Sequence, residues 1–221
     1  ASDIARYGVG SSGESTQGAG AVAMLVSQNP RILELTDDNV AQTRDVMDFW
    51  RPNYSSTPYV QGIYSTKQYL DSLKTTWAAY QERHQADFAD FAAFCLHLPY
   101  PKLALKGLNK IIPKDLNPEN KERLTNNFDA SITYSRQIGN IYTGSLYLGS
   151  FLCLNNRKTL KQEIRLASSL MVLELSPKFS QDVWLRLQRP ASFRPSRYLC
   201  QTSTLEPLLI MKNFSMKRRS W

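Results

Sequence analysis

Apolar side chains recur along the chain at two spacings, one typical of helices and one typical of strands. Residues 67–83 carry apolar side chains three and four positions apart, which predicts a helix capped by Ser65 or Thr66. Further helices are predicted over 103–112, ending before Pro113, over 128–136 after a polar lead at 117–127, and over 143–154. Short apolar runs predict strands at 19–26, 46–50 and 94–98. The mixture predicts an α/β fold.

Length and composition fit one globular unit. A chain of 221 residues with 42% hydrophobic content is large enough to bury a core in about one or two domains. No apolar run approaches the roughly 18 residues of a membrane span. The three cysteines form neither a disulfide framework nor a metal-binding pattern, so we expect a cytoplasmic protein without a metal.

The basic charge is concentrated near the end of the chain. The net charge is +8, from 27 basic and 19 acidic residues, and residues 161–221 hold 11 of the basic but only 4 of the acidic ones. A Lys/Arg-rich end with interleaved aromatic residues suggests binding to nucleic acid or to an acidic membrane surface. This is one of the open interpretations of the chain.

The segment 94–108 is the best candidate for a functional site. It places His97 between apolar residues and a proline, followed by Lys102 and Lys106 on the first turns of a predicted helix. A histidine in such a setting is often a satisfied core residue. Lysines at positions i and i+4 are often a solvated helix face. Both of these readings stay open on this segment alone.

Five segments together resemble one family. His97 to Lys106 matches the pattern H-x-P-[FY]-x-K-x-x-x-K of hydroxymethylglutaryl-CoA (HMG-CoA) synthases, enzymes of the thiolase superfamily. The resemblance continues in residues 1–26 (E-x-T-Q-G-A-G-A), 48–52 (DFWRP), 58–65 and 134–149 (YSRQIGNIYTGSLYLG), and covers most of residues 1–160. The loop at 58–65 departs from the family in two places, with Gln61 where aspartate is usual and Tyr59 after Pro58.

The resemblance implies a thiolase fold of α-β-α-β-α layers, of which this chain would hold the end of the first half and most of the second. It also implies condensation of acetyl-CoA with acetoacetyl-CoA in the mevalonate pathway, with no further cofactor, no nucleic acid or membrane partner, and a homodimeric full-length protein. The resemblance implies that His97 is the donor and acid/base group at the ketone, and that Asn140 contacts the thioester carbonyl. It implies that Ser65 contacts the acyl chain or pantetheine. Lys102 and Lys106 are implied to contact the phosphates or adenylate, and Asp48 to have a supporting role. Asn140 and Ser65 have the alternative of being turn residues that bond their own backbone.

The resemblance leaves two catalytic groups unassigned. The family acylates a cysteine thiolate and uses a glutamate to remove a proton from the acetyl methyl group. None of Cys95, Cys153 and Cys200 lies in the nucleophile motif, and Cys95 is expected to be a buried inert thiol. We therefore expect a fragment that is inactive alone.

The end of the chain resembles the family in a second reading frame. After Leu160 the similarity to the family stops. The residues from Lys161 onward can be back-translated with suitable synonymous codons and then read in the frame that starts at the third base of the Lys161 codon. This reading gives AGDKIGLFTYGSGAVSEIFSGRLVA, which resembles the missing family segment. Residues 208–221 give IDYEEFFNEEKEL in the same way. We therefore predict a thiolase-like part at 1–160 and an out-of-frame, poorly ordered tail at 161–221. A broken gene with an inert product is an open alternative.

Overall fold

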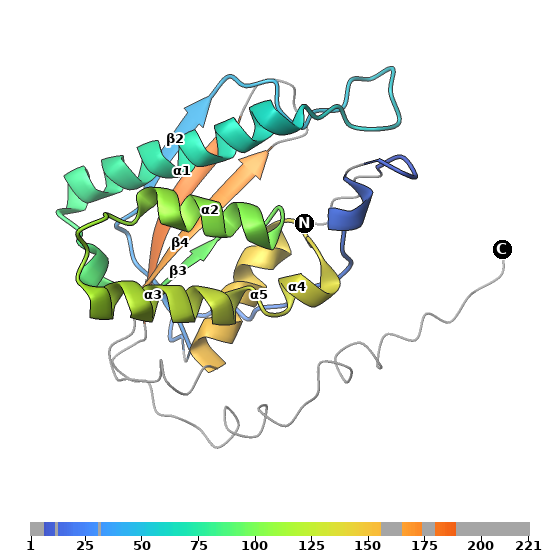
Figure 1. Cartoon of the computed structure of the whole chain (residues 1–221). Coiled ribbons are helices and arrows are strands. Elements are labelled where there is room, and N and C mark those ends of the chain that lie inside the picture. Colours follow the sequence, from blue (N-terminus) through green and yellow to red (C-terminus); the bar gives the residue numbers. More distant parts are fainter. Residues whose placement is uncertain (1–6, 12, 31, 156–164, 174–179, 189–221) are drawn as a thin grey trace.

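The structure is a computed structural model that describes residues 7–11, 13–30, 32–155, 165–173 and 180–188 (Figure 1). Its helices are α1 (Gly62–His84), α2 (Pro101–Ile111), α3 (Pro118–Ser131), α4 (Ser135–Ile138) and α5 (Thr143–Asn155), with short 3₁₀ turns at Glu14–Thr16 and Phe88–Asp90. Its strands are β1 (Glu34–Leu35), β2 (Val40–Arg44), β3 (Ala93–Leu96), β4 (Arg165–Leu173) and β5 (Ser180–Gln188).

The strands form one mixed sheet. β3 and β4 run parallel, in a register that sets Ala93 opposite Leu166, and β4 pairs antiparallel with β5. β1 and β2 both pair antiparallel with β5, on its other side. Among the described strands this order puts β3 at one edge of the sheet, where it contacts α3 and α5.

Strand β3 is buried on both faces because helices cover the sheet from both sides. Phe94 and Leu96 belong to a core cluster built with α1, α2 and α3, which lie together across the sheet in Figure 1. Ala93 and Cys95 point the other way and pack with Leu146 and Cys153 of α5. A continuous apolar run is typical of a strand buried on both faces, which explains the sequence of β3.

The larger core cluster is centred on Trp77 of α1. Its ring lies 5.0 Å from the rings of Phe88 and Phe94, and 5.8 Å from that of Phe91. Edge-to-face contacts of this kind stabilise a core beyond the area that they bury. The cluster fixes α1 against β3, whose end leads to His97.

Most of the predicted helices are confirmed, with shifted ends. The helices predicted over 67–83, 103–112 and 143–154 correspond to α1, α2 and α5, and the strand predicted at 94–98 corresponds to β3. Neither Ser65 nor Thr66 caps α1, because the helix begins earlier, after Gln61. The helix predicted over 128–136 is wrong in its bounds: α3 already begins at Pro118, where the Asn117 side chain accepts a hydrogen bond from the backbone N–H of Glu119.

Two predicted strands are wrong. Residues 19–26 form no strand, and Leu25 and Val26 are 92% and 89% exposed. Within the described part of the chain no strand pairs with them, and a strand needs a neighbour to satisfy its backbone groups. Residues 46–50 are not a strand either, because the positive φ of Phe49 (48°) breaks the extended course, and the strand in this region is β2.

The predicted tail contains β4 and β5. In β4, Leu166 and Ala167 are buried beside β3. The other residues of 161–221 lie outside the described residues. The division of the chain at residue 160 and the out-of-frame origin of the tail stay predictions.

Candidate functional site at the end of strand β3

His97 lies in the turn between β3 and α2. Leu96 and Leu98 on either side of it are buried, which holds the turn against the core. Pro101 at the first position of α2 has the backbone angle that a helix start needs. The hydroxyl of Tyr69 in α1 donates a hydrogen bond to the backbone carbonyl of His97 over 2.9 Å. The position of His97 is therefore fixed by the end of β3, the start of α2 and Tyr69 of α1.

The imidazole of His97 is held in its neutral form. Part of the residue is exposed, but its Nδ1 atom is buried and has no hydrogen-bond partner within the described structure. Burial lowers the pKa of His97 from 6.5 to about 4. The side chain is therefore uncharged at neutral pH.

A cavity of about 570 Å³ opens beside this turn. One part of its lining comes from the turn before α2 and the first residues of that helix, with Leu98, Lys102 and Leu105, and another from Ile132 and residues 135–140. Residues 15–17 of the N-terminal loop close a third side. The cavity brings Lys102 and Asn140 into one lining, although they are far apart in the sequence.

Asn140 has a fixed amide orientation. Its Oδ1 accepts hydrogen bonds from the backbone N–H of Tyr142 over 2.8 Å and from the Ser145 hydroxyl over 3.2 Å. The oxygen is thus committed to the start of α5, as expected of a turn residue. Within the described residues the two N–H groups of the amide have no acceptor, so they can donate to a ligand, since asparagine carries both functions.

Two backbone segments meet tightly at the floor of the cavity. Gly18 N–H donates to the carbonyl of Asn140 over 2.9 Å, and Asn140 N–H donates to the carbonyl of Thr16 over 2.9 Å. Glycine is required here: a Cβ at Gly18 would lie 2.0 Å from the carbonyl oxygen of Ile138. Gly139 adopts a positive φ of 80° at the same contact. This pairing ties the N-terminal loop to Asn140.

Asp48 and Ser65 form a second polar group with Tyr7 and Tyr142. Asp48 is only 5% exposed, and burial raises the pKa of its carboxyl group, while the Ser65 hydroxyl and the Phe49 backbone N–H act in the opposite direction. Neither carboxyl oxygen reaches full hydrogen-bond geometry within the described residues. The pKa of Tyr7 is raised by burial, and also by Tyr142 and Asp48.

The candidate residues from the sequence lie in two separate groups in the structure. Lys102 and Asn140 line the cavity, Asp48 and Ser65 lie together, and His97 adjoins the lining residue Leu98. Lys106 is exposed one helical turn beyond Lys102 and does not line the cavity. Sequence reasoning gave no role to Arg136, although it lines the cavity and lies in the segment 134–149 that resembles the family.

The two cysteines of the described chain are core residues. Cys95 and Cys153 are 1% and 0% exposed, and their sulfur atoms are 3.7 Å apart. Their mutual hydrogen bond and burial raise the pKa of Cys153, whereas the hydrogen bond lowers that of Cys95. The prediction that Cys95 is buried is confirmed, and Cys200 lies outside the described residues.

Neither a metal centre nor a membrane span is found in the part of the chain that the structure describes. No three His, Cys, Asp or Glu side chains there are grouped to hold a metal ion. None of the helices there combines the length and apolarity needed to cross a membrane.

Comparison with known proteins gives a consistent result. A family profile described as "Hydroxymethylglutaryl-coenzyme A synthase C terminal" matches residues 39–133. The HMG-CoA synthase of Enterococcus faecalis is 48% identical over 160 residues, which cover 72% of this chain and 42% of that protein. The cytoplasmic HMG-CoA synthase of Homo sapiens is 31% identical over 136 residues, which cover 56% of this chain and 26% of that protein.

Solved structures agree with these sequence relatives. An HMG-CoA synthase complexed with CoA has a TM-score of 0.78 and 52% identity, over 91% of this chain and 52% of that chain. MvaS in complex with 3-hydroxy-3-methylglutaryl coenzyme A has a TM-score of 0.72 and 26% identity, over 96% of this chain and 55% of that chain.

The sheet with helices on both faces is therefore an α/β thiolase-like fold, present here in part, as predicted. The chain belongs to the hydroxymethylglutaryl-CoA synthase family and corresponds to a C-terminal region of it. It spans about half the length of the solved relatives and 42% of the E. faecalis protein.

Proposed function

We propose that this chain serves as the C-terminal region of an HMG-CoA synthase, which condenses acetyl-CoA with acetoacetyl-CoA in the mevalonate pathway. The observation that carries the proposal is the cavity that joins Lys102 and Asn140 beside the end of β3. Solved relatives in complex with CoA and with 3-hydroxy-3-methylglutaryl coenzyme A support a CoA thioester as the ligand. Cytoplasmic location and homodimer formation by the full-length protein belong to the same proposal.

His97 is assigned to the ketone of acetoacetyl-CoA. Carbon–carbon bond formation at a ketone places negative charge on its oxygen, and a donor aimed there in advance lowers the barrier. Because its pKa is lowered to about 4, the imidazole is neutral and donates a hydrogen bond rather than acting as a cation. A neutral imidazole that gave a proton to the alkoxide would be left as an imidazolate, so the ring stabilises the developing oxyanion through its hydrogen bond, and an acid role would require it to take up a proton first.

Asn140 is assigned to the thioester carbonyl. Its Oδ1 is engaged by Tyr142 and Ser145, so its N–H groups are the part that is available to a carbonyl oxygen. Lys102, exposed at the first turn of α2, supplies a positive charge for phosphate. Lys106 extends that charge along the helix. Ser65 contacts the acyl or pantetheine arm, and Asp48 keeps the neighbouring region polar.

No residue of this chain is assigned to the acyl-carrying thiolate or to the base that removes the methyl proton. Cys95 and Cys153 are core thiols, and a buried structural cysteine is inert toward a large thioester. The chain therefore contributes substrate binding and hydrogen-bond donors, while the covalent step needs a thiolate outside the described residues.

Binding of acetoacetyl-CoA, measured by titration calorimetry, tests the proposal. We expect saturable binding of one ligand per chain. Lys102→Gln should weaken it roughly tenfold, as expected for a lost charge-assisted contact. Lys121→Gln, which removes an exposed lysine of α3 outside the cavity, is the matched control and should leave the affinity unchanged. Absence of binding, or an equal loss in both variants, would refute the proposed ligand site.

A further inference from the structure

The charge of the cavity lining is of one sign. Among the described side chains that line it, only Lys102 and Arg136 are charged, and both are cations. They come from different elements, Lys102 from α2 and Arg136 from α4. Apolar side chains, including Leu98, Leu105 and Ile132, complete the wall. Such a lining suits an elongated ligand with an apolar or neutral arm and an anionic end.

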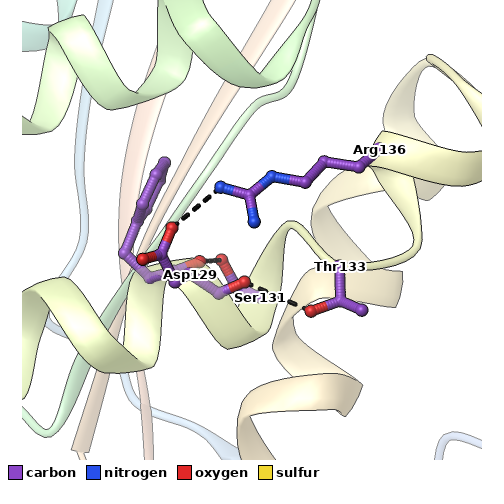
Figure 2. Close-up of polar contacts among 5 residues, drawn as sticks. Asp129, Ser131, Thr133 and Arg136 are labelled. Carbon is purple, nitrogen blue, oxygen red and sulfur yellow. Dashed lines mark hydrogen bonds and ion pairs between the residues drawn. The ribbon is translucent and has the colours of Figure 1, made fainter.

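Arg136 is held in place by Asp129 of α3. Its Nη2 lies 2.9 Å from Oδ1 of Asp129, and the two side chains are 53% and 51% exposed. An ion pair this exposed contributes little to stability, so its main effect is on the position of the guanidinium group. Figure 2 shows one terminal nitrogen of Arg136 directed at Asp129, while the other is engaged with none of the residues drawn.

The guanidinium group keeps spare donor capacity. Arginine carries five N–H donors, and within the described structure the side chain of Arg136 has one hydrogen-bonded ion pair, with Asp129. The planar fork of the remaining donors matches two oxygens of one phosphate, which the point charge of a lysine does not. Arg136 therefore offers a directional anion contact that Lys102 lacks.

We propose that Arg136 is a phosphate-recognising residue of this cavity and shares the anionic end of the CoA thioester with Lys102. The inference rests on the proposed function, because it takes the ligand to be a CoA thioester. It adds Arg136 to the two lysines as a cation that recognises phosphate, and Arg136 lies in the cavity lining whereas Lys106 does not. It also explains why Asp129 stands seven residues before Arg136, where it orients the guanidinium group across the turn between α3 and α4.

Two ligands separate this role from a general effect on the fold. CoA carries phosphates, whereas pantetheine has the same thiol arm without them. We expect Arg136→Gln to weaken CoA binding by about ten- to a hundredfold, the range of a charge-assisted hydrogen bond. Pantetheine binding, followed by ligand-detected NMR, should change less than threefold. The loss for CoA should shrink at high salt, because screening weakens the wild-type contact.

The variant set includes its own controls. Arg136→Lys keeps the charge without the fork and should fall between wild type and Arg136→Gln. Arg83→Gln removes an arginine from the last turn of α1, outside the cavity, and should bind CoA as wild type does. Thermal melts of each variant confirm that the fold is retained, as expected for a half-exposed side chain.

The failures of the two proposals are distinguishable. If wild-type chain binds CoA but Arg136→Gln binds it equally well, or loses CoA and pantetheine in the same proportion, the role of Arg136 is wrong while the proposed function stands. If wild-type chain binds no CoA, the proposed function is wrong and the inference falls with it.

Discussion

At the residue scale, burial decides whether a titratable side chain is charged. Two buried groups, His97 and Asp48, allow this to be tested. His97 is neutral because its ring is buried, and Asp48 is buried without full hydrogen-bond partners. His97 lies beside the candidate site, where perturbed pKa values tend to gather, and Asp48 belongs to the second polar group with Ser65.

The stability of the chain should fall in mild acid because of His97. Its folded pKa is about 4 against 6.5 for the unfolded chain, so the unfolded state binds more protons between these values. Stability is therefore lost as the pH falls from about 6.5 toward 4, by up to about 3 kcal/mol. Urea unfolding between pH 4 and 7 should show this slope in wild type and in His84→Gln. A slope that persists unchanged in His97→Gln would contradict the assignment.

Asp48 should show the opposite dependence. Its pKa is raised by burial, so the folded state binds more protons than the unfolded state above the ordinary pKa of the carboxyl group. Its effect is a loss of stability as the pH rises toward neutral. Asp48→Asn, which keeps the shape without the charge, should raise the melting temperature at pH 7 and change it less at pH 4. A variant that is less stable than wild type at pH 7 would show that the charged form is satisfied in the fold.

At the element scale, the site depends on a contact between two segments that are far apart in the sequence. Residues 16–18 pair with residues 138–140 at the floor of the cavity, next to the start of α5. The pairing works only because the backbones approach without side chains at Gly18 and Gly139.

Gly18→Ala should disrupt this contact. The added Cβ would lie 2.0 Å from the carbonyl oxygen of Ile138, so the two segments must move apart. We expect a destabilisation of about 1–3 kcal/mol in urea unfolding, the usual cost of overpacking, together with weaker CoA binding. Gly8→Ala is the matched control, because nothing lies within 4 Å of a Cβ there and it should be close to neutral. Equal effects of the two substitutions would show that the contact does not support the site.

Elements with strong local signals were predictable from sequence, and those that depend on distant partners were not. The spacing of Leu73, Trp77 and Tyr80 predicts α1, and the pattern from His97 to Lys102 predicts the turn into α2. The apolar run at 19–26 predicted a strand wrongly, because pairing is a non-local property. The place of Arg136 in the cavity was missed for the same reason, since it depends on how α3 and α4 meet α2.

At the scale of the whole molecule, the chain carries part of the family fold. It matches 42% of the E. faecalis relative, and its described cysteines are both in the core. Its sheet includes β4 and β5, which lie within the segment predicted to be out of frame. Reading the encoding DNA across Leu160 tests that prediction directly.

Incubation with acetyl-CoA should leave the chain unmodified. Acylation requires an accessible thiolate, and Cys95 and Cys153 are buried. Intact-mass measurement is expected to show no stable acetyl adduct. A stoichiometric acetyl thioester, mapped to any of the three cysteines, would show that the chain carries its own nucleophile.

The central claim is that a CoA thioester binds in the cavity between α2 and the segment 132–140. Hydrogen exchange of the chain with and without acetoacetyl-CoA, read by mass spectrometry, tests it most directly. The account predicts slower exchange in peptides that cover residues 15–18, 98–105 and 132–142, and no change in α1 beyond Trp77. Protection confined to the basic segment 161–221, or no protection at saturating ligand, would contradict it.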